Sequence, residues 1–123
     1  MPTDPIRVLI VDDHPSFRRA ARELLRARGF AVVGEAADAS SALSLVAVTA
    51  PHSVLLDVRL GADSGLAVAS ALRRAYPAVG VLLVTSDQDH AALAARCPGT
   101  RGPVSKLRLA GADLAALLAP ADG

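Results

Sequence analysis

The stretch Ser-Val-Leu-Leu-Asp-Val-Arg-Leu, from Ser53 to Leu60, decides the fold of this 123-residue chain. Its first apolar residues follow one another without polar alternation, which is typical of a strand covered on both faces, as in a parallel sheet. The run ends at Asp57, and open α/β sheets bind their ligands at the carboxyl ends of their strands. We therefore expect Asp57 to lie in a site, together with polar residues that follow neighbouring strands.

Strand-like and helix-like stretches alternate along the whole chain. Besides the central strand, the strands are predicted at residues 6–11, 30–36, 79–84 and 101–105. The helices are predicted at residues 14–28, 38–49, 65–75, 87–96 and 107–118, with residues 59–64 as a loop. The last strand contains Gly102 and Pro103 and therefore suits an edge position. This alternation predicts an α/β fold, an open five-stranded parallel sheet with helices on both faces, because five units are too few for a closed barrel.

Composition narrows the class of function. The length suits one domain, predicted to span residues 1–123 with its core at about 6–118. A net charge of +1 and only three aromatic residues argue against direct nucleic-acid binding. No apolar run reaches the length of a membrane span, the N-terminus is no signal peptide, and Cys97 is the only cysteine. We expect a cytoplasmic protein that binds neither membranes nor nucleic acids.

Polar residues follow four of the five predicted strands. Asp12 and Asp13 come after the first strand, Asp57 ends the third, Thr85 follows the fourth, and Lys106 follows the fifth. Lys106 is the only lysine in a chain with twelve arginines. The first and third strands of a doubly wound sheet adjoin where the winding reverses, which is the usual ligand crevice. These side chains are therefore expected to converge.

Three converging carboxylates would repel one another unless a cation lay among them. Hard oxygen ligands with room for water suit Mg²⁺, which leaves positions for phosphate oxygens. A carboxylate can accept a phosphoryl group covalently, and a hydroxyl and an ammonium would complete its pocket. This pattern indicates that Asp57 accepts a phosphoryl group beside Thr85 and Lys106.

The order and approximate spacing of these residues resemble the receiver (response-regulator) domain of two-component signalling. The segments Val-Asp-Asp-His-Pro-Ser-Phe-Arg, starting at Val11, and Val-Val-Gly-Glu-Ala, starting at Val32, are especially similar to receivers of LuxR-type (NarL/FixJ-like) regulators. The resemblance implies a flavodoxin-like (βα)5 receiver fold over about residues 6–118. It also implies a role in signal transduction and in transcription regulation.

The resemblance assigns a role to each residue at a matching position. Asp57 is the phosphoacceptor, Thr85 senses the phosphoryl group and Lys106 pairs with it. Asp12, Asp13, Asp57 and the backbone carbonyl of Arg59 hold Mg²⁺. The expected partners are a sensor histidine kinase and either a downstream protein or a DNA-binding output domain that is absent from this chain, and a homodimer is possible. Such a phosphoprotein is not an enzyme.

Several positions depart from the family pattern. Gly61 and Leu107 stand where proline is usual, Ser64 replaces an aspartate, and Pro103 replaces the usual Tyr or Phe three residues before Lys106. Pro103 has no ring that could move inward when Thr85 moves, so an altered readout is expected. An alternative is an atypical receiver (pseudo-receiver) that acts as an interaction module without phosphorylation. A phosphatase-type or nucleotide-binding enzyme is a more distant alternative, since the chain has no phosphate-binding glycine loop.

Overall fold

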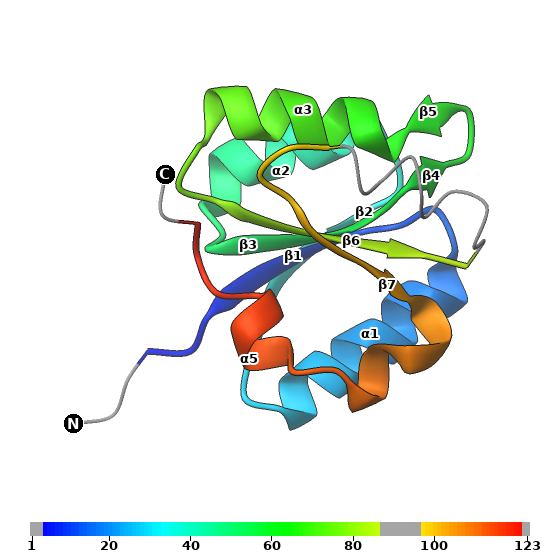
Figure 1. The fold of residues 1–123 in the computed structure, drawn as a ribbon, viewed down its shortest axis with the longest axis vertical. Helices are drawn as coiled ribbons and strands as arrows, with labels where there is room; N and C mark the ends of the chain where they lie inside the picture. Colours follow the sequence, from blue (N-terminus) through cyan, green and yellow to red (C-terminus); the bar gives the residue numbers. More distant parts are fainter. Residues whose placement is uncertain (1–3, 87–96, 122–123) are drawn as a thin grey trace.

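A computed structural model describes residues 4–86 and 97–121. Five strands form one parallel sheet in the order β2-β1-β3-β6-β7 (Figure 1). The strands are β1 (Arg7–Val11), β2 (Ala31–Ala36), β3 (Ser53–Asp57), β6 (Gly80–Thr85) and β7 (Arg101–Ser105). This confirms the predicted open parallel sheet, with the first and third strands as neighbours and the Pro103 strand at an edge.

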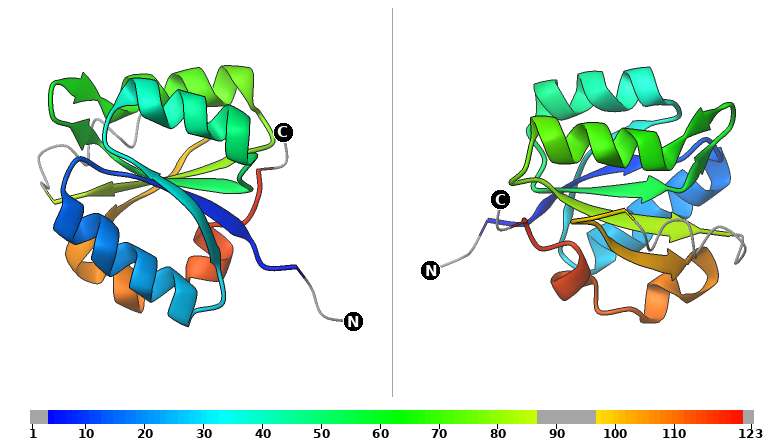
Figure 2. Two further views of the ribbon diagram at one scale, coloured as in Figure 1. Left: turned by 180° about the vertical axis from the view of Figure 1, so that it is seen from behind. Right: turned by 45° about the horizontal axis from the view of Figure 1, so that its top comes forward.

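The helices pack on both faces of the sheet (Figure 2). They are α1 (Pro15–Ala27), α2 (Ala39–Thr49), α3 (Gly65–Ala75), the 3₁₀ helix η2 (Lys106–Gly111) and α5 (Leu114–Leu117). The α2 and α3 helices cover one face, whereas α1, η2 and α5 cover the other. None of the helices in the described ranges 4–86 and 97–121 has the length and apolarity needed to cross a membrane.

The alternation of side chains along each strand divides the core into two layers. In β3, Val54 and Leu56 pack with α2 and α3, while Leu55 packs with α1, η2 and α5. All three side chains are at most 1% exposed. Because β3 is covered on both faces, it needs no polar residue before Asp57, which accounts for the unbroken apolar run.

The segment predicted as a single helix over residues 107–118 is different in the structure. It consists of η2, an extended residue at Ala112, and the four-residue α5, so the prediction of one helix was wrong. The reason lies in Gly111 and Asp113. Glycine weakens a helix interior, and the Asp113 side chain accepts a hydrogen bond from the backbone of Ala116 and so caps a new helix.

The segment after β3 is more regular than predicted. The predicted loop at residues 59–64 contains a small antiparallel hairpin of β4 (Arg59–Leu60) and β5 (Asp63–Ser64). Asp63 of this hairpin accepts a hydrogen bond from the backbone N–H of Ala39 at 3.0 Å, which ties the hairpin to the start of α2. The helix predicted at residues 87–96 lies outside the described residues.

Candidate functional site

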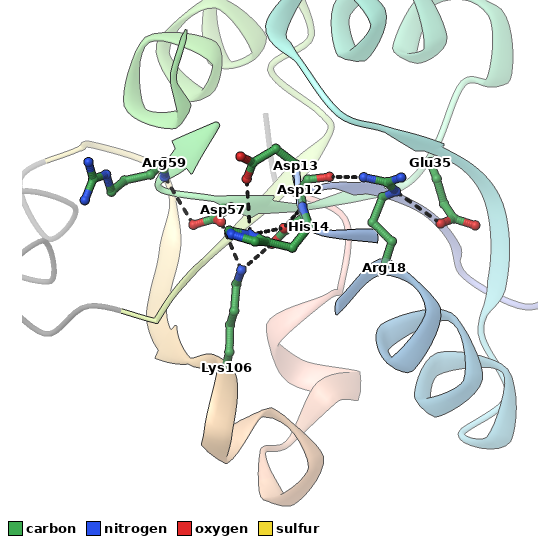
Figure 3. Close-up of polar contacts among 8 residues, drawn as sticks. All are labelled: Asp12, Asp13, His14, Arg18, Glu35, Asp57, Arg59 and Lys106. Carbon is green, nitrogen blue, oxygen red and sulfur yellow. Dashed lines mark hydrogen bonds and ion pairs between the residues drawn. The ribbon is translucent and has the colours of Figure 1, made fainter. Parts of the chain in front are cut away.

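Asp57 and Lys106 meet at the carboxyl end of the sheet (Figure 3). Asp57 is the last residue of β3, and Lys106 begins η2 directly after β7. The Lys106 Nζ atom lies 3.0 Å from Asp57 Oδ2 and 2.6 Å from Asp12 Oδ2. The two carboxyl groups are almost fully buried, so the only lysine of the chain bridges two buried acids.

Local backbone contacts fix the position of the Asp57 side chain. Its Oδ1 atom accepts a hydrogen bond from the backbone N–H of Arg59 at 3.1 Å. Gly65, the first residue of α3, packs so closely that a Cβ there would stand 1.9 Å from the Asp57 carbonyl oxygen. Only glycine therefore permits α3 to begin this close to the end of β3.

The turn that carries Asp12 is braced from several sides. The backbone N–H of His14 donates to Asp12 Oδ1 at 2.8 Å, and the Arg18 guanidinium donates to the Asp12 carbonyl at 2.7 Å. Arg18 in turn lies 3.5 Å from a carboxylate oxygen of Glu35 at the edge of the sheet. The buried carboxylate of Asp12 is thus held without depending on Lys106 alone.

Burial is the largest influence on the pKa of Asp57. Its exposed fraction is 3%, and loss of hydration raises the pKa of the carboxyl group above its ordinary value. The Arg59 amide and the Lys106 ammonium oppose this shift in pKa, whereas the nearby charge of Asp12 adds to it. The site therefore concentrates negative charge that one ammonium only partly balances.

The acidic cluster has the donor set of a cation site. One ligand atom each from Asp12, Asp13, His14 and Asp57 lie within 4.8 Å of one another. Within the described residues, Asp12 Oδ2 and Asp13 Oδ1 are buried and accept no hydrogen bond of good geometry. Lys106 Nζ lies 2.6 Å from the first of these oxygens, and His14 Nδ1 lies 3.2 Å from the second. Such oxygens are available to a cation.

Two pockets open beside the cluster. A polar pocket of about 340 Å³ is lined by Asp13, His14, Asp57, Arg59, Gly61 and Ser86. A second pocket of about 450 Å³ is lined by Thr85, Ser86, Pro103, Val104, Ser105, Leu107 and Arg108. Ser86 lies on the boundary between the two. The acidic pocket is thus open to solvent and could admit a phosphoryl donor.

The structure brings four of the predicted site residues into direct contact or close proximity, namely Asp12, Asp13, Asp57 and Lys106. Arg59 lines the acidic pocket, and Thr85 ends β6, almost buried, beside the second pocket. Sequence reasoning gave no site role to Ser86 or to His14. His14 is exposed, and its Nδ1 atom contacts both neighbouring aspartates.

This arrangement of side chains occurs in a chain that matches a known protein family. The model of the response regulator receiver domain matches residues 8–115. The chain belongs to this family. A receiver domain is the part of a two-component system that partners with a histidine kinase, and the observed sheet and acidic cluster agree with that membership.

Individual relatives come from the regulators that the sequence resembles. The nitrate/nitrite response regulator NarP of Escherichia coli is 40% identical over 82 residues, which are 66% of this chain and 38% of that protein. The receiver domain spans less than half the length of the curated relatives it matches. They include a probable transcriptional regulatory protein, NarL of Mycobacterium tuberculosis, and one solved structure is of a LuxR-family response regulator. The predicted similarity to LuxR-type receivers is therefore confirmed at the level of the domain.

Solved structures agree with the fold. A LuxR-family response regulator from Aurantimonas superposes with a TM-score of 0.79 at 35% identity, covering 91% of this chain and 81% of that one. The receiver domain of NarL from Mycobacterium tuberculosis gives 0.81 at 31% identity, with 94% and 95% covered. A response regulator from Burkholderia pseudomallei, solved with a phosphorylated aspartic acid and a calcium ion, gives 0.78 at 28% identity, with 91% and 66% covered.

Proposed function

We propose that this receiver domain accepts a phosphoryl group from a histidine kinase on the carboxylate of Asp57. The contact between Asp57 and Lys106 Nζ at 3.0 Å, at the edge of an open acidic pocket, is the observation that supports this most directly. The phosphorylated aspartic acid in the Burkholderia pseudomallei regulator supports the same chemistry in a relative.

The proposed step exchanges one bond to phosphorus for another. An oxygen of Asp57 forms the new bond while the bond between phosphorus and the kinase histidine nitrogen breaks. The electron pair stays on that nitrogen, which then takes up a proton. Lys106, already 3.0 Å from Asp57 Oδ2, would pair with the incoming phosphoryl oxygens, and the Thr85 hydroxyl at the end of β6 would donate a hydrogen bond to them.

The acidic cluster fits Mg²⁺. Two buried carboxylate oxygens that lack hydrogen bonds, within a group of ligand atoms spanning 4.8 Å, are the hard donors that this ion prefers. Asp12, Asp13, Asp57 and the backbone carbonyl of Arg59 would hold it. When bound, it would offset the negative charge that the phosphoryl group brings to three carboxylates.

Phosphorylation would then act on a partner by shifting a two-state equilibrium. We propose a cytoplasmic signalling role, with the histidine kinase upstream and either a separate protein or a DNA-binding output domain downstream. A homodimer is one form that the switch could take. Each domain accepts one phosphoryl group and does not turn over a substrate, so it is not an enzyme in this proposal.

Intact mass spectrometry after incubation with acetyl phosphate and Mg²⁺ tests the proposal. We expect one added phosphoryl group in the wild type and none in Asp57→Asn or in a sample treated with EDTA. The phosphoryl adduct could be too short-lived for mass spectrometry. Beryllofluoride, a stable mimic of the phosphoryl group, is therefore added as well, and its binding is detected by changes in the amide NMR signals. Folded wild type that responds to neither reagent would refute phosphoacceptance and favour a binding module, and turnover of generic phosphate esters would favour an enzyme.

A further inference from the structure

An aromatic ring faces the ammonium group of Lys106. The Nζ atom lies 4.4 Å from the centroid of the Phe17 ring, within the range of an attractive cation–π contact. Phe17 belongs to the first turn of α1, and Lys106 begins η2, so the contact joins two elements that lie 89 positions apart in the chain. The Lys106 side chain is only 11% exposed, which strengthens such a contact.

The surroundings of Lys106 are apolar along its stem and acidic at its end. An apolar slot of about 210 Å³ between α1 and η2 is lined by Phe17, Ala20, Ala21, Leu24, Lys106, Leu109 and Ala110. The ammonium leaves this slot to meet Asp12 at 2.6 Å and Asp57 at 3.0 Å. The ring thus takes a place beside the ammonium that water would otherwise occupy, and it presents the negative face of its π-system there.

The backbone that carries Lys106 follows a strand at the edge of the sheet. β7 pairs with a neighbouring strand on one edge only, and the next side chain, Leu107, is 96% exposed. A long lysine side chain has several rotatable bonds. The two ion pairs hold its end, and the path of its stem depends on what packs beside it. The Phe17 ring supplies that packing from α1.

We propose that Phe17 is a positioning residue, whose ring holds the Lys106 ammonium at the Asp57 carboxylate and thereby speeds phosphoryl transfer. The kinetic part of this inference rests on the proposed function. Phe17 acts through Lys106 and takes no part in the bond changes. Its ring also packs against the core layer under α1, so the experiment must separate positioning from stability.

The contact can be observed without any phosphoryl donor. Because Lys106 is the only lysine, protein labelled with ¹³C-lysine gives a single set of ε-methylene NMR signals. A ring at 4.4 Å should move these proton signals upfield of their position in an unstructured peptide. We expect the shift to disappear in Phe17→Leu, which keeps an apolar side chain, and to persist in Phe17→Tyr, which keeps the ring.

The rate of phosphorylation by acetyl phosphate tests the consequence. From the usual strength of a cation–π contact, we expect Phe17→Leu to react about threefold to tenfold more slowly and Phe17→Tyr to react within about twofold of wild type. Leu25→Val is the matched control, since it trims a buried side chain of the same helix and core layer but leaves the ring in place. It should lose stability and keep its rate.

Two outcomes would overturn the inference. Wild type without an upfield shift would show that the ring does not face the ammonium, and an unchanged rate in Phe17→Leu would show that the contact does not position Lys106 for the reaction. Failure of the proposed function has a different signature. The wild type would then take no phosphoryl group while the ε-methylene shift remained, which would remove the kinetic role and leave the contact itself observed.

Discussion

Replacing Asp57 with asparagine should stabilise the folded protein when no divalent cation is present. The wild-type carboxylate is buried, its pKa is raised by that burial, and it lies in a cluster whose ligand atoms span 4.8 Å. Asparagine has nearly the same shape but carries no charge. The substitution therefore removes a costly ion from the folded state and changes the packing little.

The size of the gain follows from the burial of Asp57 and from the charges around it. Loss of hydration, the largest cause of the raised pKa, costs several kcal/mol for a buried ion. Repulsion from Asp12 at a distance of up to 4.8 Å adds roughly 3.5 kcal/mol in an effective dielectric of about 20. Attraction to Lys106 at 3.0 Å offsets about 5.5 kcal/mol of this cost in the same dielectric. The balance is about 1 to 2 kcal/mol in favour of Asp57→Asn, or roughly 4–8 °C in Tm for a domain of this size.

The pH dependence gives the prediction its sign. In the unfolded chain the carboxyl group has its ordinary pKa of 3.8, and in the folded protein its pKa is higher. Below pH 3.8 the group is protonated in both states, so the folded state bears no cost. As pH rises through the folded pKa the group ionises in the folded state and the cost appears in full. The gain from Asp57→Asn should therefore be largest near neutral pH and shrink toward pH 4.

Urea denaturation in EDTA, at several values between pH 4 and pH 8, measures this directly. Asp38→Asn is the control, because Asp38 is an exposed helix cap whose pKa is lowered by hydrogen bonds from the Ser41 backbone and side chain. The same chemical change there should bring no stabilisation. If Asp57→Asn were less stable than wild type near pH 7, or its gain did not depend on pH, the electrostatic account of the site would be wrong.

Three further predictions concern the metal, the start of α3 and the C-terminal segment. Mg²⁺ at one hundred times its Kd should raise the free energy of unfolding of the wild type by about 2.7 kcal/mol. Most of this rise should be absent from Asp13→Asn, and an equal rise in both proteins would exclude Asp13 as a ligand. Gly65→Ala should cost about 3 kcal/mol or more in urea denaturation, since its Cβ would stand 1.9 Å from a carbonyl oxygen, and a wild-type midpoint would refute that close packing. Arg101→Met should lower the free energy of unfolding by about 2 kcal/mol, because hydrogen bonds to backbone carbonyls are lost. Its reaction with acetyl phosphate should keep the wild-type rate, and a slower reaction would show that this end of β7 affects the site.

The sequence predicts the sheet and most of the site for a common physical reason. A run such as Val54 to Leu56 can only be buried on both faces, and parallel strands bring their carboxyl ends to one edge. Asp57 and Lys106 therefore come to the same edge of the sheet, although 49 positions separate them in the chain. To predict that these two residues meet, it is enough to locate the ends of the strands. The change from apolar to polar residues marks those ends in the sequence.

Other features depend on distances that one sequence does not contain. The spacing of Leu109, Leu114 and Leu118 fits one helix. In the structure all three are buried, but they belong to two short helices that are separated at Gly111 and Ala112. Gly111 indicates a break in this helix, but the helical spacing of the leucines favoured a single helix in the prediction. The contact of Lys106 with the Phe17 ring had no such signal, since Phe17 reads equally well as an ordinary core residue.

The C-terminal segment is fastened at the end of the sheet opposite the acidic pocket. The Arg101 guanidinium donates to the carbonyls of Leu117, Ala119 and Pro120, and the Ser53 hydroxyl donates to those of Leu118 and Ala119. A pulling force applied at residue 121 would therefore load first the hydrogen bond from the Ala121 N–H to the Ala78 carbonyl, and then the amino ends of β3 and β7. The hydrogen bonds there act as a mechanical anchor. Tension from any attached chain would reach Lys106 only after that anchor had yielded.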